Sequence, residues 1–182
     1  PVGSDFDTQI DLVWPRSVGV GLKHEICCCQ RVGVDVIWYD WSHAFDRLDL
    51  VFSNPSNPIV GALIPGGVLT DSLPMRWEDS VSLRLGYEWD SSDVTTWRLG
   101  YVYHDSPVPD ATLNPYLDGV LEHAFAAGVS RAYGHGVWNL AYQYSFSEER
   151  NVGQSDIVGD DFTNSTLDAA AHWVSISVLV PY

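Results

Sequence analysis

Two arginines and two glutamates are the residues whose types and spacing point to binding chemistry. Arg84 and Arg98 lie on either side of a short connector at 90–92, in segments where apolar and polar residues alternate. A three-residue turn there places the two arginines directly opposite each other on one face. Facing cations repel, so the pair requires an anion between them. That anion is either a carboxylate of the protein, Glu88 or Glu122, in an internal salt-bridge lattice, or the anionic headgroup of a ligand.

The other reactive residue types show no catalytic or metal-binding arrangement. The six histidines form no H-E-x-x-H motif, and the adjacent cysteines at 27–29 lack C-x-x-C spacing. Three cysteines cannot all pair internally, so we expect no function for them. The run at 104–106 contains the residue types of a catalytic triad, but three neighbours on a strand cannot stack within hydrogen-bond reach. We therefore expect no enzyme, no metal site and no cofactor.

The elements that position the charged residues are β-strands, because apolar and polar residues alternate with period two. Strands are expected over 16–26, 31–53, 76–89, 93–104, 119–132, 136–147 and 169–181. The second keeps its apolar residues in phase throughout, so we expect one long strand bent near Trp41. The lipid-facing set is Leu83, Leu85, Leu99, Leu140, Tyr142 and Ile176. The interior set is Arg84, Glu88, Arg98, Glu122 and Gln143.

Short and long connectors alternate along the chain. The breaks near 27–30, 90–92 and 134–135 are short, whereas those near 54–74, 105–118 and 148–167 are long. An outer-membrane β-barrel has short turns at one end and long loops at the other, while a soluble sandwich has no reason to sort them. The pattern favours an all-β, antiparallel transmembrane barrel over a soluble β-protein.

Composition excludes several classes of function. The chain has 182 residues and a formal net charge of −15, so no basic stripe exists to bind nucleic acid. No stretch approaches the ~20 consecutive apolar residues of a transmembrane helix. No signal peptide opens the sequence. For an exported protein we expect a processed or truncated start.

A collinear set of motifs resembles the long-chain fatty-acid transporter family of Gram-negative outer membranes. The most specific element is the stretch from Arg98 to Asp110, which ends in Ser106-Pro107-Val108-Pro109-Asp110 and is followed by Asn-Pro and an acidic residue at 118. Segments 14–21, 38–42 and 77–88 are similar to the family's proline-initiated strand, bent-strand motif and next strand. An aromatic residue ends the chain, as in the family. Pro181 beside it is unusual, since proline cannot donate to a strand ladder.

The resemblance implies a fourteen-stranded monomeric barrel that moves long-chain fatty acids or other hydrophobic compounds across the outer membrane. Loops would capture the substrate, an internal site would hold it, and an opening in the wall would release it. Residues 1–182 match the C-terminal half and supply seven strands in an open half-barrel. The N-terminal hatch and first strands are absent, so we expect this half to pair with the missing one and to contact outer-membrane lipid.

The resemblance also implies substrate contacts at Tyr39 and at the loop from Ser106 to Asp110. The loop has a purely architectural interpretation as well. Pro107 and Pro109 fix φ and remove two donors, which makes a rigid arch, and Asp110 is placed to cap the following turn. The alternative function class is a soluble β-sandwich that serves as a binding or adhesion module.

Overall fold

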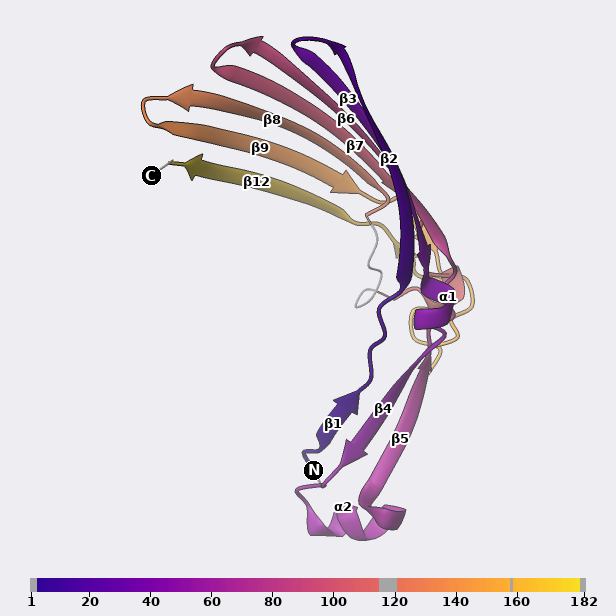
Figure 1. Cartoon of the computed structure of the whole chain (residues 1–182). Coiled ribbons are helices and arrows are strands. Elements are labelled where there is room, and N and C mark those ends of the chain that lie inside the picture. Colours follow the sequence, from indigo (N-terminus) through magenta and orange to yellow (C-terminus); the bar gives the residue numbers. More distant parts are fainter. Residues whose placement is uncertain (1–2, 115–120, 158, 181–182) are drawn as a thin grey trace.

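The main body of the protein is one curved antiparallel sheet of seven strands. The structure is a computed structural model that describes residues 3–114, 121–157 and 159–180. The strand order is β12-β9-β8-β7-β6-β3-β2. The bounds are β2 Arg16–Cys27, β3 Gln30–Asp40, β6 Ser80–Ser92, β7 Thr95–His104, β8 His123–Tyr133, β9 Gly136–Phe146 and β12 Ala170–Leu179. Figure 1 shows the tight turns at one end of the fan and the longer connectors at the other.

All seven strands of the expected half-barrel are present, with β2 at one edge and β12 at the other. The fold class is therefore confirmed. The seventh strand ends at Leu179, and β8 begins at His123 rather than at 119. The terminal residues 181 and 182, the motif positions 115 and 118, and residues 119 and 120 lie outside the described residues.

The register confirms which residues share a face. Leu85 is opposite Tyr101, which is opposite Phe125 on the next strand, while Arg98 is opposite Glu88. The same pairing puts all six residues of the predicted lipid-facing set on one face. Among the predicted interior residues, those within strands lie on the opposite face: Arg84, Glu88, Arg98 and Gln143.

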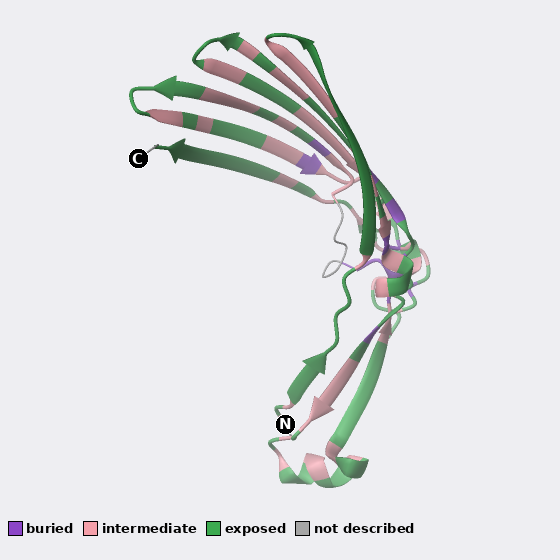
Figure 2. Cartoon of the chain, viewed as in Figure 1, coloured by how far each residue is buried: buried purple, intermediate pink, exposed green. Residues whose placement is uncertain are grey.

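Burial identifies the concave face of the sheet. On the polar face Ser82 is fully buried and Ser145 is 3% exposed, whereas Leu85 and Ile176 on the apolar face are 41% and 71% exposed. Side chains crowd together on the inside of a curved sheet and splay apart on the outside, so the polar face is the concave one. Figure 2 shows the long exposed stretches along these strands.

No second sheet packs against the apolar face in the described part of the chain. A β-sandwich buries the inner faces of two sheets against each other, and here a single layer leaves its apolar side uncovered. The sandwich alternative is therefore wrong. A barrel wall has this single-layer construction, with the apolar side turned to lipid.

The expectation of one bent strand over 31–53 is wrong. β3 ends at Asp40, a short helix α1 (Trp41–Ala44) follows, and β4 (Arg47–Ser53) belongs to a different sheet. The reason is pairing. The ladder between β3 and β6 stops at Tyr39 opposite Ser80, and the ladder between β3 and β2 stops one residue later, at Asp40 opposite Arg16.

Outside the seven-stranded sheet, the chain forms several short elements that the sequence pattern did not predict. β1 (Asp7–Ile10), β4 and β5 (Val68–Pro74) form a three-stranded sheet that extends away from the main one (Figure 1). Between β4 and β5 lie helix α2 (Pro58–Leu63) and the 3-10 turn η1 (Pro65–Gly67). Asn57 caps α2 by accepting a hydrogen bond from Ile59 N at 3.0 Å. A second 3-10 turn, η2 (Asp110–Thr112), and the pair β10 (Arg150–Asn151) and β11 (Thr166–Leu167) complete the loop end.

The turn between β6 and β7 lies nearer the C-terminus than predicted. Trp89 is directly opposite Trp97, so both face the same side. However, Asp90 still pairs with Thr96, a bulge follows, and the tip is at 93–94 rather than at 90–92. The Asp90 carboxylate accepts hydrogen bonds from Thr96 Oγ1 at 2.6 Å and from Arg31 at 2.5 Å, which holds it within the ladder.

The only cluster of buried apolar residues in the described part of the chain lies at the loop end. It consists of Leu48, Met75, Trp77, Val108, Leu113 and Val152. These residues come from β4, the segment before β6 and the two long connectors after β7 and β9. The loops are therefore packed against one another and fixed over one end of the sheet.

The face assignment predicts unequal costs for two arginine substitutions. Leu85→Arg places a charge on the apolar face midway along β6 and should lower the free energy of unfolding by about 2–4 kcal/mol. Gln143→Arg, on the concave face, should cost clearly less. The measurement is the urea midpoint of each full-length barrel folded in lipid vesicles. Equal losses from the two variants would contradict the assignment.

Candidate functional site

A ladder of polar contacts crosses the concave face near the tight-turn end. Arg31 forms ion pairs with two carboxylates. Its Nη2 lies 2.5 Å from Asp90 Oδ2, and its Nε lies 2.6 Å from Glu88 Oε1. Glu88 also accepts a hydrogen bond from Arg98 at 2.5 Å. The chain continues from Arg98 through Ser130, Asn139 and Ser177. These contacts connect six neighbouring strands, from β3 to β12.

The predicted pair of facing arginines is wrong. Arg84 lies opposite Val102, because the β6–β7 turn is displaced toward the C-terminus. Its Nη2 is 3.5 Å from Tyr39 Oη, which is a weak contact. Arg98 finds its anion in Glu88, as the salt-bridge interpretation requires. Glu122 contacts neither arginine, and its Oε2 accepts a hydrogen bond from Glu148 N at 3.2 Å.

The loop from Ser106 to Asp110 is held by Arg150, which the sequence analysis missed. Arg150 donates to Ser106 Oγ at 2.8 Å, to Val108 O at 2.7 Å and to Asp110 Oδ1 at 2.5 and 2.9 Å. The expectation that Asp110 caps the following turn is wrong, because its carboxylate is bound by this guanidinium and makes no cap hydrogen bond. The only available signal was a single arginine after two glutamates in an acidic loop.

The same loop is also fixed by backbone contacts and packing. Pro107 O accepts a hydrogen bond from Glu78 N at 2.7 Å. Val108 is 2% exposed and belongs to the apolar cluster. Its two prolines fix φ and have no backbone N–H to donate. The loop is therefore an extended arch tethered by these contacts, as the architectural interpretation predicts.

Beneath this arch lies an aromatic pocket of about 300 Å³. It is formed where β3, β6 and β7 meet the loops, at the end opposite the tight turns. Its lining residues are Tyr39, Trp41, Trp77, Ser80, His104, Asp105, Pro107 and Leu121. Tyr39 and Pro107 are sequence-predicted site residues that the structure brings together, whereas Ser106 and Asp110 do not line the pocket.

Stacked rings give the pocket one rigid wall. The rings of Trp77 and Phe45 stack at 4.7 Å, and Trp41 meets Trp77 edge to face at 4.9 Å. Trp77 is buried, and its Nε1 has no hydrogen-bond partner in the part of the chain that the structure describes. Offset and edge-to-face contacts are the favoured geometry for aromatic ligands too. The pocket is therefore suited to a small ring or a short apolar chain.

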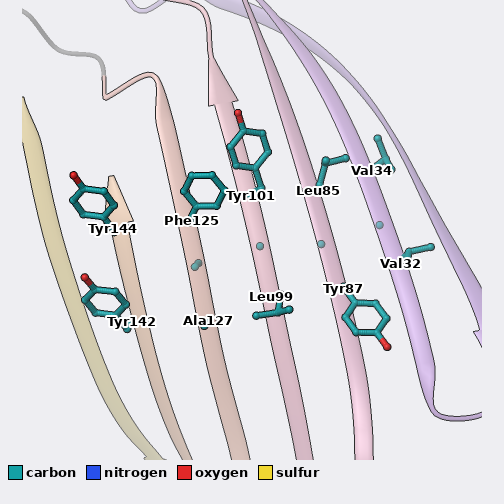
Figure 3. A pocket seen from close by; sticks show the side chains of 14 residues that line it. Val32, Val34, Leu85, Tyr87, Leu99, Tyr101, Phe125, Ala127, Tyr142 and Tyr144 are labelled. Atoms are coloured by element: carbon teal, nitrogen blue, oxygen red, sulfur yellow. The ribbon is translucent and has the colours of Figure 1, made fainter. Parts of the chain in front are cut away.

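A larger hollow, about 690 Å³, lies on the convex face instead. Figure 3 shows its two ridges, one containing Leu85, Tyr101 and Phe125 and the other containing Tyr87 and Leu99. The floor between them is a cross-strand row of small residues: Gly33, Gly86, Gly100 and Ala126. This furrow therefore lies on the apolar face of the sheet, opposite to the polar ladder.

A hollow of about 510 Å³ lies over part of the same row on the concave face. Lys23, Arg31, Asp35, Glu88 and Arg98 surround it. A Cβ added at Gly86 would meet nothing within 4 Å, so the small residues make this part of the wall thin. Its charges distinguish it from the aromatic pocket at the loop end.

The described residues contain neither a cluster of metal-ligating side chains nor a helix that could cross a membrane. No group of three or more histidine, cysteine, aspartate or glutamate side chains is arranged to hold a metal ion. Among the helices described, none is both long enough and apolar enough to cross a membrane.

Removing Arg150 should free the arch. Arg150→Ala breaks contacts to a carboxylate, a hydroxyl and a carbonyl, and hydrogen bonds to charged groups contribute about 1.5–3 kcal/mol each. Because the guanidinium is partly exposed, we expect a local loss of about 1–3 kcal/mol in total. Amide hydrogen exchange at residues 106–113 measures it. The matched control is Arg47→Ala, whose ion pair with Asp49 is exposed; faster exchange in both variants, or in neither, would contradict the tether.

Two solved structures are similar to the chain over nearly all of it. The crystal structure of the Ralstonia pickettii toluene transporter TbuX matches with a TM-score of 0.65 and 17% identity, covering 97% of this chain and 36% of that one. A deletion mutant of the TodX monoaromatic hydrocarbon channel matches with a TM-score of 0.65 and 18% identity, covering 90% and 34%. Neither neighbour is described as an enzyme.

Comparison with protein-family models and with curated proteins gives no match. The chain spans about a third of the length of its structural neighbours. At this level of identity the similarity establishes the fold. The chain has the fold of one part of an outer-membrane hydrocarbon-transporter barrel.

Proposed function

We propose that this chain forms the C-terminal half of the wall of an outer-membrane barrel through which apolar small molecules cross. The observation that carries the proposal is the single-layer curved sheet, with a polar concave face and an apolar convex face. A wall of this kind encloses a polar interior and presents hydrocarbon to lipid. The long loops then lie outside the cell and the tight turns face the periplasm.

The height of the apolar band supports a membrane location. Trp89 and Trp97 pair near the tight turns, and Trp38 lies opposite Val81 near the loop end. Trp89 is eight positions after Val81, so the two lie about 26 Å apart along the strand. With a strand tilt of ~40°, their separation along the barrel axis is about 20 Å. With the reach of the side chains, this distance agrees with the apolar band of about 25 Å between aromatic girdles in known barrels.

The two edges of the sheet support a partner that completes the barrel. Unpaired backbone groups at β2 and β12 are costly in hydrocarbon. Because β2 and β12 are the first and last of seven antiparallel strands, both edges run in the same direction. Antiparallel closure therefore requires an odd number of further strands, which the missing N-terminal half would supply.

The aromatic pocket is the proposed point of entry for the substrate. It opens at the loop end, and three aromatic rings and Pro107 line it. A volume of about 300 Å³ accommodates a single ring, in agreement with the aromatic hydrocarbons named for the structural neighbours. Long-chain fatty acids are the second candidate substrate, from the family resemblance. A candidate cation for their carboxylate is Lys23 on the concave face, which like Arg84 pairs with no acid among the described side chains.

Filling the pocket should block uptake. Ser80 is 5% exposed and lines the pocket, so Ser80→Trp occupies its volume. We expect the full-length parent to give uptake of labelled toluene or oleate in cells that lack such a transporter, and the variant to lose it at least tenfold. The matched control is Ser72→Trp on exposed β5.

Heat-modified migration of each variant on gels verifies that the barrel is folded. No uptake of either compound by the folded parent would refute the transport proposal. Normal uptake by folded Ser80→Trp would show that the substrate does not enter through this pocket. Selective loss of oleate uptake in Lys23→Gln would favour the fatty-acid substrate.

A further inference from the structure

The turn that joins β2 to β3 brings two thiols into contact. Cys27 is the last residue of β2 and lies opposite Gln30, so the residues at 28 and 29 form the tip of the turn. The Sγ atoms of Cys27 and Cys29 are 3.3 Å apart. The turn is held in place by Asp90 N, which donates to Cys29 O at 2.8 Å. Cys28, between the two, is exposed.

The geometry allows a covalent bond between the two sulfurs. Residues two apart have Cα atoms no more than about 7 Å from each other, and the bend of a turn shortens this distance. A disulfide requires roughly 4.4–6.8 Å between Cα atoms. A bulge between Glu25 and Cys27 shifts the register of β2 against β3, so that Cys27 lies opposite Gln30.

We propose that Cys27 and Cys29 form an intramolecular disulfide and that Cys28 stays a free thiol. The proposal rests on the proposed function in one respect, because it takes the tight turns to face the oxidising periplasm. It assigns the first and third cysteines of the run to each other, although the odd count and the spacing predicted no function for any of them.

The bond forms by exchange with a disulfide-donating oxidant. The Cys27 thiolate attacks the donor's disulfide, which gives a mixed disulfide and releases one donor thiolate. The Cys29 thiol loses its proton and attacks the Cys27 sulfur, which releases the second donor thiolate. Two protein thiols are thereby oxidised to one disulfide, and the donor disulfide is reduced to two thiols that take up both protons.

The order of the two attacks follows from the contact. The pKa of Cys29 is raised to about 11, chiefly because its thiol is hydrogen-bonded to Cys27. The proton therefore stays on Cys29, and Cys27 provides the first nucleophile. Cys29 then resolves the mixed disulfide from 3.3 Å away.

The test uses a peptide that the sequence itself supplies. Trypsin cleaves after Lys23 and Arg31 and releases residues 24–31, which contain all three cysteines. The full-length parent in isolated outer membranes is trapped with acid, alkylated without reductant, digested and analysed by mass spectrometry. We expect one alkylated cysteine in this peptide, and three after reduction.

Serine variants identify the bonded pair. In Cys28→Ser the unreduced peptide should contain no alkylated cysteine, whereas Cys27→Ser and Cys29→Ser should each expose the partner thiol. When reduced protein in detergent is exposed to oxidised glutathione, Cys29→Ser should retain a glutathione adduct on Cys27, and the parent should not. Folding of each variant is verified by heat-modified migration.

Three alkylated cysteines in the parent both from membranes and after treatment with oxidised glutathione in detergent, or a disulfide that Cys28→Ser abolishes, would overturn the proposal. The result is independent of transport, because the thiol state is read from the peptide whether or not the cells take up hydrocarbon. If the turn faces a reducing compartment, membranes give three free thiols while glutathione still forms the pair in detergent, and the periplasmic orientation is then the part refuted.

Discussion

The constraint on which the structure depends is the antiparallel ladder of backbone hydrogen bonds. In hydrocarbon each unpaired N–H or C=O group costs several kcal/mol, so every strand must have a neighbour on both sides. The ladder also fixes which side chains share a face, since neighbours across it point the same way. Two copies of this chain in the same membrane orientation cannot close on each other with antiparallel seams, because β2 and β12 run in the same direction. The closing strands must therefore differ from those of this chain in orientation.

Charge on the concave face follows from the same register. Arg31, Glu88, Asp90 and Arg98 occupy adjacent ladder positions on three strands, and each cation contacts at least one acid. Single exposed ion pairs contribute little, but a shared network of half-buried groups is screened less. The network neutralises Arg98 and leaves no free cation there to attract an anionic substrate. Lys23, which lines the same concave hollow, takes no part in these contacts.

The strands were predictable because alternation with period two is written directly into the sequence. Seven strands, their order and the shared faces followed from it. The errors occurred where pairing changes without a change in pattern. Leu48, Leu50 and Phe52 continue the alternation of β3, yet β4 pairs with β1 and β5. The prediction that Arg84 faces Arg98 failed because Asp90 is held in the ladder by hydrogen bonds from Thr96 and Arg31. No local sequence pattern encodes these contacts. Arg150 was missed because its partners lie about 40 residues earlier in the chain.

The position of the aromatic pocket follows from the end of the sheet. β3 loses its pairing with β6 after Tyr39 and with β2 after Asp40, and its chain turns into α1 instead of continuing along β6. That turn brings Trp41 and Phe45 onto Trp77, just before β6 begins. Backbone contacts from Trp77 N to Phe45 O and from Glu78 N to Pro107 O then fix the segment between the α1 region and the arch. Rings packed this way cannot fill the corner between three diverging segments, so a small hollow remains. Its walls are aromatic because rings bury the most apolar area at a site with no ladder to stabilise it.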